Sequence, residues 1–128
     1  MTQPPRVYPP RVLDASALLT LFDGNPAVMR LLDDAELGEV FLLMPAVAIA
    51  EAESVIRAGV RLWEPFLLFP GVRALELTEH TAIESGRLMN RAPLMVAEVV
   101  YEAQAMNAVV VTRIPEAYAG HDVALMVV

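Results

Sequence analysis

Cysteine and lysine are both absent from this chain of 128 residues. Without cysteine there is no disulfide framework, and no metal site can use thiolate ligands. The absence of cysteine also fits a reducing compartment, so a cytoplasmic location is expected. All nine basic residues are arginine, against 16 acidic residues, which gives a formal net charge of −7. That balance argues against broad electrostatic attraction to nucleic acid, which normally draws on a basic face.

Long apolar runs are also missing, although 56% of the residues are hydrophobic. No run reaches the roughly 18 residues of a transmembrane helix, so we expect no membrane partner. Residues 1–10 contain four prolines and no apolar signal segment, which predicts a proline-rich tail. Residues 11–128 are enough for one domain and too few for two. A domain this apolar cannot easily bury all its hydrophobic surface, which predicts a homodimer.

Short apolar segments alternate with helical segments along the chain. Pro26 and Thr78 mark typical helix starts, and Gly59 marks a helix end. Residues 108–112 form a continuous apolar segment, typical of a strand buried on both faces of a parallel sheet. The alternation predicts an α/β fold with a parallel sheet of about five strands. The expected strands cover residues 11–14, 39–44, 72–77, 108–112 and 123–128; the expected helices cover residues 16–22, 26–35, 45–58, 61–69, 79–89 and 93–107.

Two acidic residues follow the first two of these strands. Asp14 closes the first expected strand, and Glu51 lies on the helix that follows the second. Ligands of open α/β sheets bind outside the carboxyl ends of the strands, so we expect both carboxylates to face one cleft there. Carboxylate oxygens are ligands that Mg²⁺ prefers, and two of them suggest a divalent metal site.

Helical spacing sorts the other acidic residues. Glu53 and Arg57 stand four residues apart, opposite the apolar side of their helix, and a surface ion pair is expected. Glu98 and Glu102 share one stripe of a helix that is otherwise apolar nearly all round. Like charges at this spacing are destabilising unless a cation lies between them. Glu98 is therefore either a displaced metal ligand or part of a salt bridge, with a nearby arginine or with a partner subunit.

Together these segments resemble the PIN domain family. The resemblance rests on Asp14-x-Ser16-Ala17-Leu18, on Pro45-Ala46-Val47 with Glu51, and on Val110-Val111-Thr112 before Pro115-Glu116-Ala117-Tyr118, spread over residues 11–128. It is nearest to the small bacterial PIN proteins that include toxins of VapBC-type toxin–antitoxin pairs. The resemblance implies a Rossmann-like parallel sheet, frequent homodimers, an antitoxin-like protein partner, and Mg²⁺- or Mn²⁺-dependent cleavage of RNA.

The resemblance also assigns roles to single residues. Asp14 and Glu51 match two acids of the family's metal site, so both are expected to be catalytic residues and metal ligands. Ser16 matches the small hydroxyl that supports the first acid. Thr112 and Glu98 are also expected to support this site, although Glu98 departs from the family, many of whose members have a histidine at its position.

Two other acids of the family's site are missing. The third normally stands near Pro93, at the start of the long helix, and the fourth stands where this chain has Ile114. Neither proline nor isoleucine can ligate a metal. One loosely held Mg²⁺ or Mn²⁺ ion is the most that the remaining acids are expected to bind, unless Glu98 or Asp122 replaces the missing ones.

Two functional hypotheses follow. In the first, the chain is a ribonuclease-like PIN protein of the toxin lineage, with a depleted acidic site and weak or lost activity. In the second, it is a non-catalytic module that keeps the fold, forms a homodimer and binds a protein or a nucleotide. Asp14, Ser16 and Glu51 favour the first hypothesis, whereas the missing acids favour the second.

Overall fold

The computed structural model describes residues 8–128, which are built around a parallel sheet of five strands in the order β3-β2-β1-β4-β5. The strands are β1 (Arg11–Leu13), β2 (Leu42–Pro45), β3 (Val72–Leu75), β4 (Val109–Thr112) and β5 (Ala124–Val127). Every neighbouring pair runs parallel. The predicted α/β fold with about five parallel strands is confirmed. Residues 1–7 of the expected proline-rich tail lie outside the described residues.

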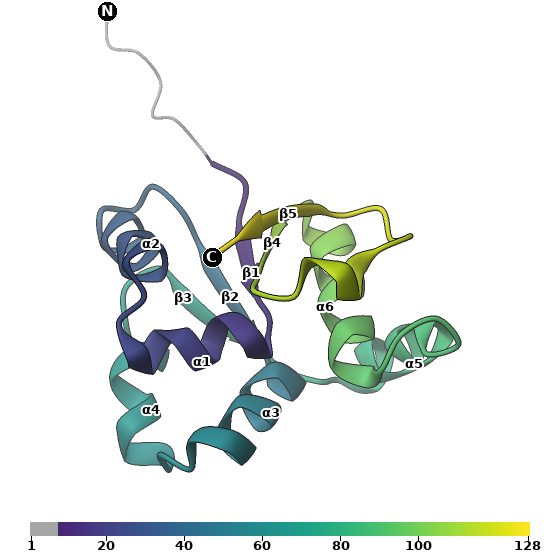
Figure 1. Ribbon diagram of the computed structural model, residues 1–128, viewed down its shortest axis with the longest axis horizontal. Helices are drawn as coiled ribbons and strands as arrows, with labels where there is room; N and C mark the ends of the chain where they lie inside the picture. Colours follow the sequence, from purple (N-terminus) through teal and green to yellow (C-terminus); the bar gives the residue numbers. More distant parts are fainter. Residues whose placement is uncertain (1–7) are drawn as a thin grey trace, which may run out of the picture.

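Within residues 8–128, six α-helices flank this sheet, as Figure 1 shows. They are α1 (Ala15–Asp23), α2 (Pro26–Glu36), α3 (Ala46–Ile56), α4 (Val60–Leu67), α5 (Glu79–Leu88) and α6 (Leu94–Met106), and a 3₁₀ helix, η1 (Pro115–Tyr118), lies between β4 and β5. In Figure 1, α1 and α2 lie on one side of the strands, and α5 and α6 lie on the other. None of these helices is long and apolar enough to cross a membrane.

Polar residues set the helix starts where the sequence predicts them. Asn25 Oδ1 accepts the Ala27 N–H at 2.9 Å and so begins α2, with proline at its first position. Thr78 Oγ1 accepts the Thr81 N–H at 3.1 Å and begins α5 in the same way. Such bonds satisfy backbone donors that have no partner inside the helix. All six expected helices are present, with ends that differ from the observed ones by at most two residues.

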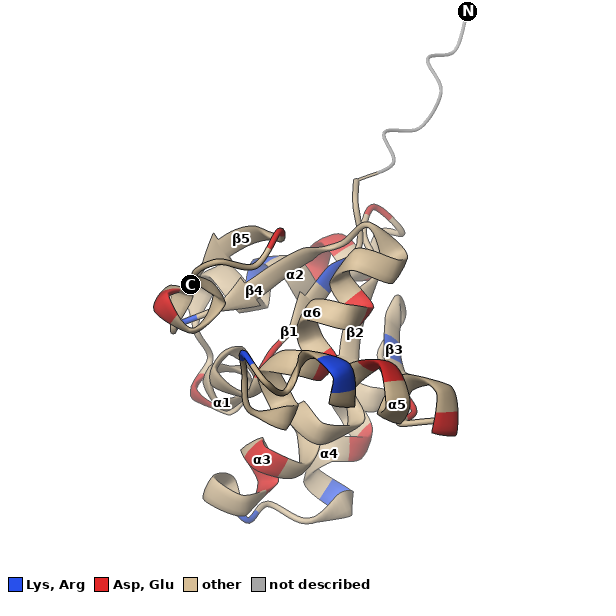
Figure 2. Cartoon of the chain, turned by 90° about the vertical axis from the view of Figure 1, so that its right-hand side faces the viewer, with Lys and Arg blue, Asp and Glu red and all other residues tan. Residues whose placement is uncertain are grey.

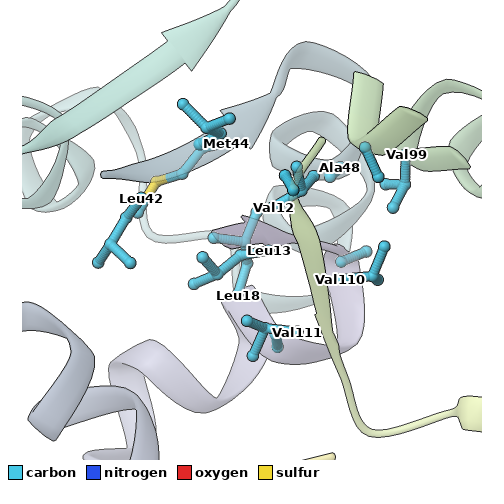
Figure 3. Close-up of a cluster of buried hydrophobic side chains, with 14 of the residues drawn as sticks. Val12, Leu13, Leu18, Leu42, Met44, Ala48, Val99, Val110 and Val111 are labelled. Atoms are coloured by element: carbon cyan, nitrogen blue, oxygen red, sulfur yellow. The ribbon is translucent and has the colours of Figure 1, made fainter. Parts of the chain in front are cut away.

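The core lies between the central strands and the helices on both faces. Val12 and Leu13 of β1 and Val110 and Val111 of β4 have no exposed surface. Figure 3 shows these four side chains together with Leu18 of α1. Successive side chains of a strand point to opposite faces, so burial of two consecutive residues in each strand means that both faces of the sheet are covered. The expected buried strand at 108–112 is the observed β4.

We expect Leu18→Ala to lower the free energy of unfolding by about 2–5 kcal/mol, because it removes apolar contacts and leaves a cavity. Leu18 is fully buried, whereas 80% of the Leu68 surface is exposed. Leu68→Ala is therefore the matched control, and should change that free energy by less than about 0.5 kcal/mol. Urea unfolding followed by circular dichroism measures both variants. Equal losses from the two substitutions would contradict this assignment of the core.

Candidate functional site

Asp14 lies directly after β1 and begins α1. Its backbone N–H donates to the Val111 carbonyl at 3.2 Å, which continues the pairing of β1 with β4. Its side-chain Oδ1 accepts the Ala17 N–H at 2.9 Å and the Ser16 hydroxyl at 2.6 Å. The bond from Ala17 caps the helix start. The Asp14 side chain is completely buried, so it already has a structural role at this junction.

The second carboxylate oxygen of Asp14 is bonded to a residue with no predicted role. Tyr118, at the end of η1, donates its hydroxyl to Asp14 Oδ2 at 2.8 Å, and its side chain is buried. Burial raises the pKa of Tyr118 far above its ordinary value; the charge of Asp14, their hydrogen bond and the charge of Glu51 raise it further. The phenol therefore keeps its proton and remains a donor. The sequence motif contains Tyr118, but nothing in the sequence indicates where its ring points.

Two hydroxyl groups connect Asp14 to the segment that follows β4. Ser16 donates to Asp14 and accepts the Arg113 N–H at 2.8 Å. Thr112 Oγ1 accepts the Ile114 N–H at 2.9 Å and lies 3.3 Å from Ser16 Oγ. Since the Ser16 proton is directed at Asp14, the Thr112 hydroxyl is the donor in that contact. The two predicted supporting hydroxyls, Ser16 and Thr112, are thus in one network with Asp14.

Glu51 lies on α3, which packs against α1, and its side chain is exposed. Its negative charge contributes to the raised pKa of Tyr118, which is bonded to Asp14. Glu51 stands in the second turn of the helix that follows β2, and Asp14 directly follows β1, so both belong to the region beyond the carboxyl ends of these neighbouring strands. Among the described residues, the hydrogen-bond network of this region includes the predicted residues Asp14, Ser16 and Thr112 but not the Glu51 carboxylate.

The geometry of this region does not fit a resident Mg²⁺ or Mn²⁺ ion. Such an ion needs several oxygen ligands with free lone pairs at about 2.0–2.6 Å. Both oxygens of the Asp14 carboxylate are engaged by protein donors, and neither reaches solvent. Within the described residues, no group of three or more His, Cys, Asp or Glu side chains is placed to hold a metal.

The positions of the missing acids add no ligand. Pro93 precedes α6 as its N-cap without a side-chain hydrogen bond, and Ile114 precedes η1. Asp122 is exposed in the segment before β5, where its backbone carbonyl accepts the Gln104 side chain at 3.3 Å. None of them forms a three-ligand metal cluster with Asp14 and Glu51.

Glu98 lies on α6 and is buried, with 1% of its surface exposed. Its Oε1 accepts the Val47 N–H at 3.1 Å, in the first turn of α3, where the helix dipole stabilises a negative charge. Its Oε2 is buried without a hydrogen-bond partner among the described residues. Burial raises the pKa of Glu98; the Val47 N–H opposes this shift, and the charge of Glu102 adds to it. Among the described residues, the partner of Glu98 is therefore a backbone amide, and no arginine forms a salt bridge with it.

The expected ion pair between Glu53 and Arg57 is wrong. Arg57 ends α3 in the left-handed conformation, with φ 54°, so it no longer continues the helical spacing. The Glu53 carboxylate instead accepts the Ala58 N–H at 2.8 Å, the Gly59 N–H at 2.9 Å and Trp63 Nε1–H at 3.1 Å. These hydrogen bonds lower the pKa of Glu53, and the bond from Trp63 has the largest effect. Glu53 thus holds the turn between α3 and α4 together.

Beside this turn, an apolar pocket of about 280 Å³ lies between α3 and α4. Trp63 is buried and packs edge-on against Phe22 of α1, at 4.9 Å between ring centroids. Val60, at the start of α4, is 71% exposed. The pocket is lined by Ala46, Ile49, Ala50, Glu53, Val60, Trp63 and Leu67.

Comparison with known proteins gives likenesses of structure and none of sequence, since no family model and no curated protein matches. The chain resembles a chain of VapBC2 from Rickettsia felis bound to a DNA fragment from their promoter. That match has a TM-score of 0.70 and 11% identity, and covers 92% of this chain and 98% of the other. A toxin–antitoxin complex from Klebsiella pneumoniae matches with a TM-score of 0.67 and 15% identity, over 91% of this chain and 95% of the other.

The chain has a PIN-like fold. FitAcB from Neisseria gonorrhoeae has a similar structure, with a TM-score of 0.63 and 20% identity over 91% of this chain and 96% of the other. At these identities the likeness is one of fold, and it extends over nearly the whole chain. The resemblance drawn from the sequence is confirmed at that level.

We expect Glu98→Gln to make the protein more stable than the wild type at pH 7. The folded-state pKa of Glu98 is raised above its ordinary value of 4.5, because burial favours the protonated side chain. Protonated Glu98 therefore makes its full contribution to the free energy of unfolding below about pH 4.5. The contribution is lost as the pH rises through the raised value. Glutamine stays neutral and still offers an oxygen to the Val47 N–H.

The free energy of unfolding from urea curves, measured between pH 4.5 and pH 7, checks this prediction. The difference between Glu98→Gln and wild type should grow with pH. Glu64→Gln is the control, because Glu64 is exposed on α4. A constant difference across this range would show that Glu98 does not titrate as described.

Proposed function

We propose that this chain is a toxin-type protein of the VapC-like PIN lineage in which RNA cleavage is weak or lost. The observation that carries the proposal is the state of Asp14, which matches the first acid of the family's site. Asp14 is completely buried, and all its side-chain hydrogen bonds are with protein donors. The fold supports the lineage, because similar structures come from toxin–antitoxin complexes.

The chemistry of phosphodiester hydrolysis explains why this state matters. The reaction needs an activated water and compensation of the charge that builds on phosphate oxygens, and a metal ion held by carboxylates supplies both. Here Glu51 is the one exposed acid of the predicted pair. We therefore expect Mg²⁺ and Mn²⁺ to bind weakly or not at all.

The distribution of charge supports weak engagement of RNA. Figure 2 shows the arginines as separated blue segments on several elements, among more numerous acidic ones. With a net charge of −7, the chain does not have the balance that favours contacts with many phosphates.

A second function is favoured by the apolar surface around α3 and α4. Val60, Leu62 and Leu68 are 71%, 58% and 80% exposed, and Val60 also lines the 280 Å³ pocket. Exposed apolar patches of this kind mark protein–protein interaction sites. In this alternative the chain is a non-catalytic, cytoplasmic interaction module that forms a homodimer or binds an antitoxin-like protein.

Asp14→Asn is the substitution that tests the loss of cleavage. Asparagine keeps the size of the side chain, and its Oδ1 can still accept the Ala17 N–H as a helix N-cap, whereas its NH₂ group replaces an acceptor by a donor; circular dichroism of the variant checks that the fold is retained. We expect the wild type and Asp14→Asn to degrade RNA equally slowly in the presence of Mn²⁺, as measured by gel electrophoresis of labelled RNA.

Asp33→Asn, at an exposed position of α2, controls for the change in net charge. Brisk Mn²⁺-dependent cleavage by the wild type and by Asp33→Asn, abolished in Asp14→Asn, would contradict the proposal. In that case Asp14 would be a working metal ligand.

A further inference from the structure

We infer that the Tyr118 hydroxyl occupies the position at Asp14 that a metal ion would need, so that this centre is closed by a phenol and works without metal. The residues present do not fit a cation, and Tyr118 supplies the physical reason. The inference deepens the proposed loss of cleavage, because it names the group that blocks the site. It also makes Tyr118 a positioning residue for the end of the sheet.

Protein donors occupy both oxygens of the Asp14 carboxylate. Oδ1 receives two donors, the Ala17 N–H and the Ser16 hydroxyl, and Oδ2 receives the Tyr118 hydroxyl at 2.8 Å. A carboxylate binds a divalent cation through lone pairs that face it at about 2.0–2.6 Å. The phenol oxygen stands at the oxygen that the α1 donors leave free. Asp14 has no exposed surface, so the phenol hydroxyl is the group that a cation would have to replace at Oδ2.

Protein groups also compensate the negative charge of the buried Asp14 carboxylate. A buried carboxylate is costly unless donors surround it, and hydrogen bonds to a charged group are the strong ones. Asp14 has three such donors, and it stands at the N-terminus of α1, where the helix dipole favours a negative charge. The Asp14 carbonyl also accepts the Leu18 N–H at 3.0 Å, the first backbone bond of that helix. The negative charge is thus stabilised without a cation.

Backbone hydrogen bonds on both sides of Tyr118 hold its ring in place. Arg113 and Ile114 donate their backbone N–H groups to Ser16 and Thr112, which fixes the entry to η1. At the exit, the His121 N–H donates to the Tyr118 carbonyl at 3.1 Å. With both ends fixed and the ring buried, moving the hydroxyl away from Asp14 requires local opening of η1.

Tyr118→Phe tests the inference, because it removes the hydroxyl and keeps the ring. We expect its Tm to fall by roughly 5–10 °C, through loss of a buried hydrogen bond to a charged acceptor. Adding millimolar MnCl₂ should then raise the Tm of Tyr118→Phe by at least about 2 °C, since a ligand that binds only the folded state stabilises it. The Tm of the wild type should not respond to MnCl₂.

Two further variants make the result specific. Tyr101→Phe removes a hydroxyl from a half-buried tyrosine whose ring packs edge-on against His80, and should behave like the wild type. Asp14→Asn combined with Tyr118→Phe should lose the response to MnCl₂. Differential scanning fluorimetry measures the Tm, and titration calorimetry with MnCl₂ measures binding directly.

Three results would overturn the inference. They are a wild-type Tm that rises with MnCl₂ as much as that of Tyr118→Phe, a Tyr118→Phe variant as stable as Tyr101→Phe, and a Tyr118→Phe variant that stays insensitive to MnCl₂. These measurements use no RNA. A wild type that does not cleave RNA but binds Mn²⁺ through Asp14 would refute this inference and leave the proposed function standing.

Discussion

The buried carboxylate of Asp14 is the constraint on which this end of the molecule depends. A charged side chain without exposed surface is stable only when its oxygens are fully hydrogen-bonded. Asp14 meets this requirement with donors from α1 and η1, elements more than 90 residues apart in sequence. Because Ser16 also accepts the Arg113 N–H, the same network sets the path of the chain from β4 into η1. The start of α1, the end of β4 and the position of Tyr118 therefore depend on one another.

Glu98 is a second buried acid, and it is stabilised less completely. It connects α6 with the start of α3 through one bond to the Val47 N–H, while its other oxygen has no partner among the described residues. Burial accordingly raises its pKa, and that of Glu102 one turn further along α6. Asp14 holds its charge with three donors, whereas Glu98 is displaced towards its neutral form. The difference follows from the number of donors within reach of each carboxylate.

Local patterns in the sequence were enough for the fold. Pro26, Thr78 and the apolar segment at 108–112 act within a few residues, so helix starts and a doubly buried strand could be placed without knowing the contacts between them. The same holds for Asp14 and Ser16, which are neighbours in the chain. The alternation of strand and helix segments was likewise enough to predict the parallel sheet.

Contacts that depend on tertiary packing could not be placed in this way. The bond from Val47 to Glu98 joins residues 51 positions apart, and helical spacing does not reveal it. Arg57 adopts the left-handed conformation at the end of α3, so it is not positioned one helical turn after Glu53. Glu53 accepts a hydrogen bond from Trp63 instead. The direction of the Tyr118 ring depends on how η1 sits against α1. Neither composition nor periodicity contains that information.

Closure of the Asp14 centre by the Tyr118 hydroxyl can be observed in a crystal structure of the wild-type protein soaked in MnCl₂, with anomalous data collected for manganese. We expect the Tyr118 hydroxyl within hydrogen-bonding distance of Asp14 Oδ2 and no anomalous peak beside the Asp14 carboxylate. A manganese peak at about 2.0–2.6 Å from an Asp14 oxygen, with the Tyr118 ring displaced, would contradict this expectation.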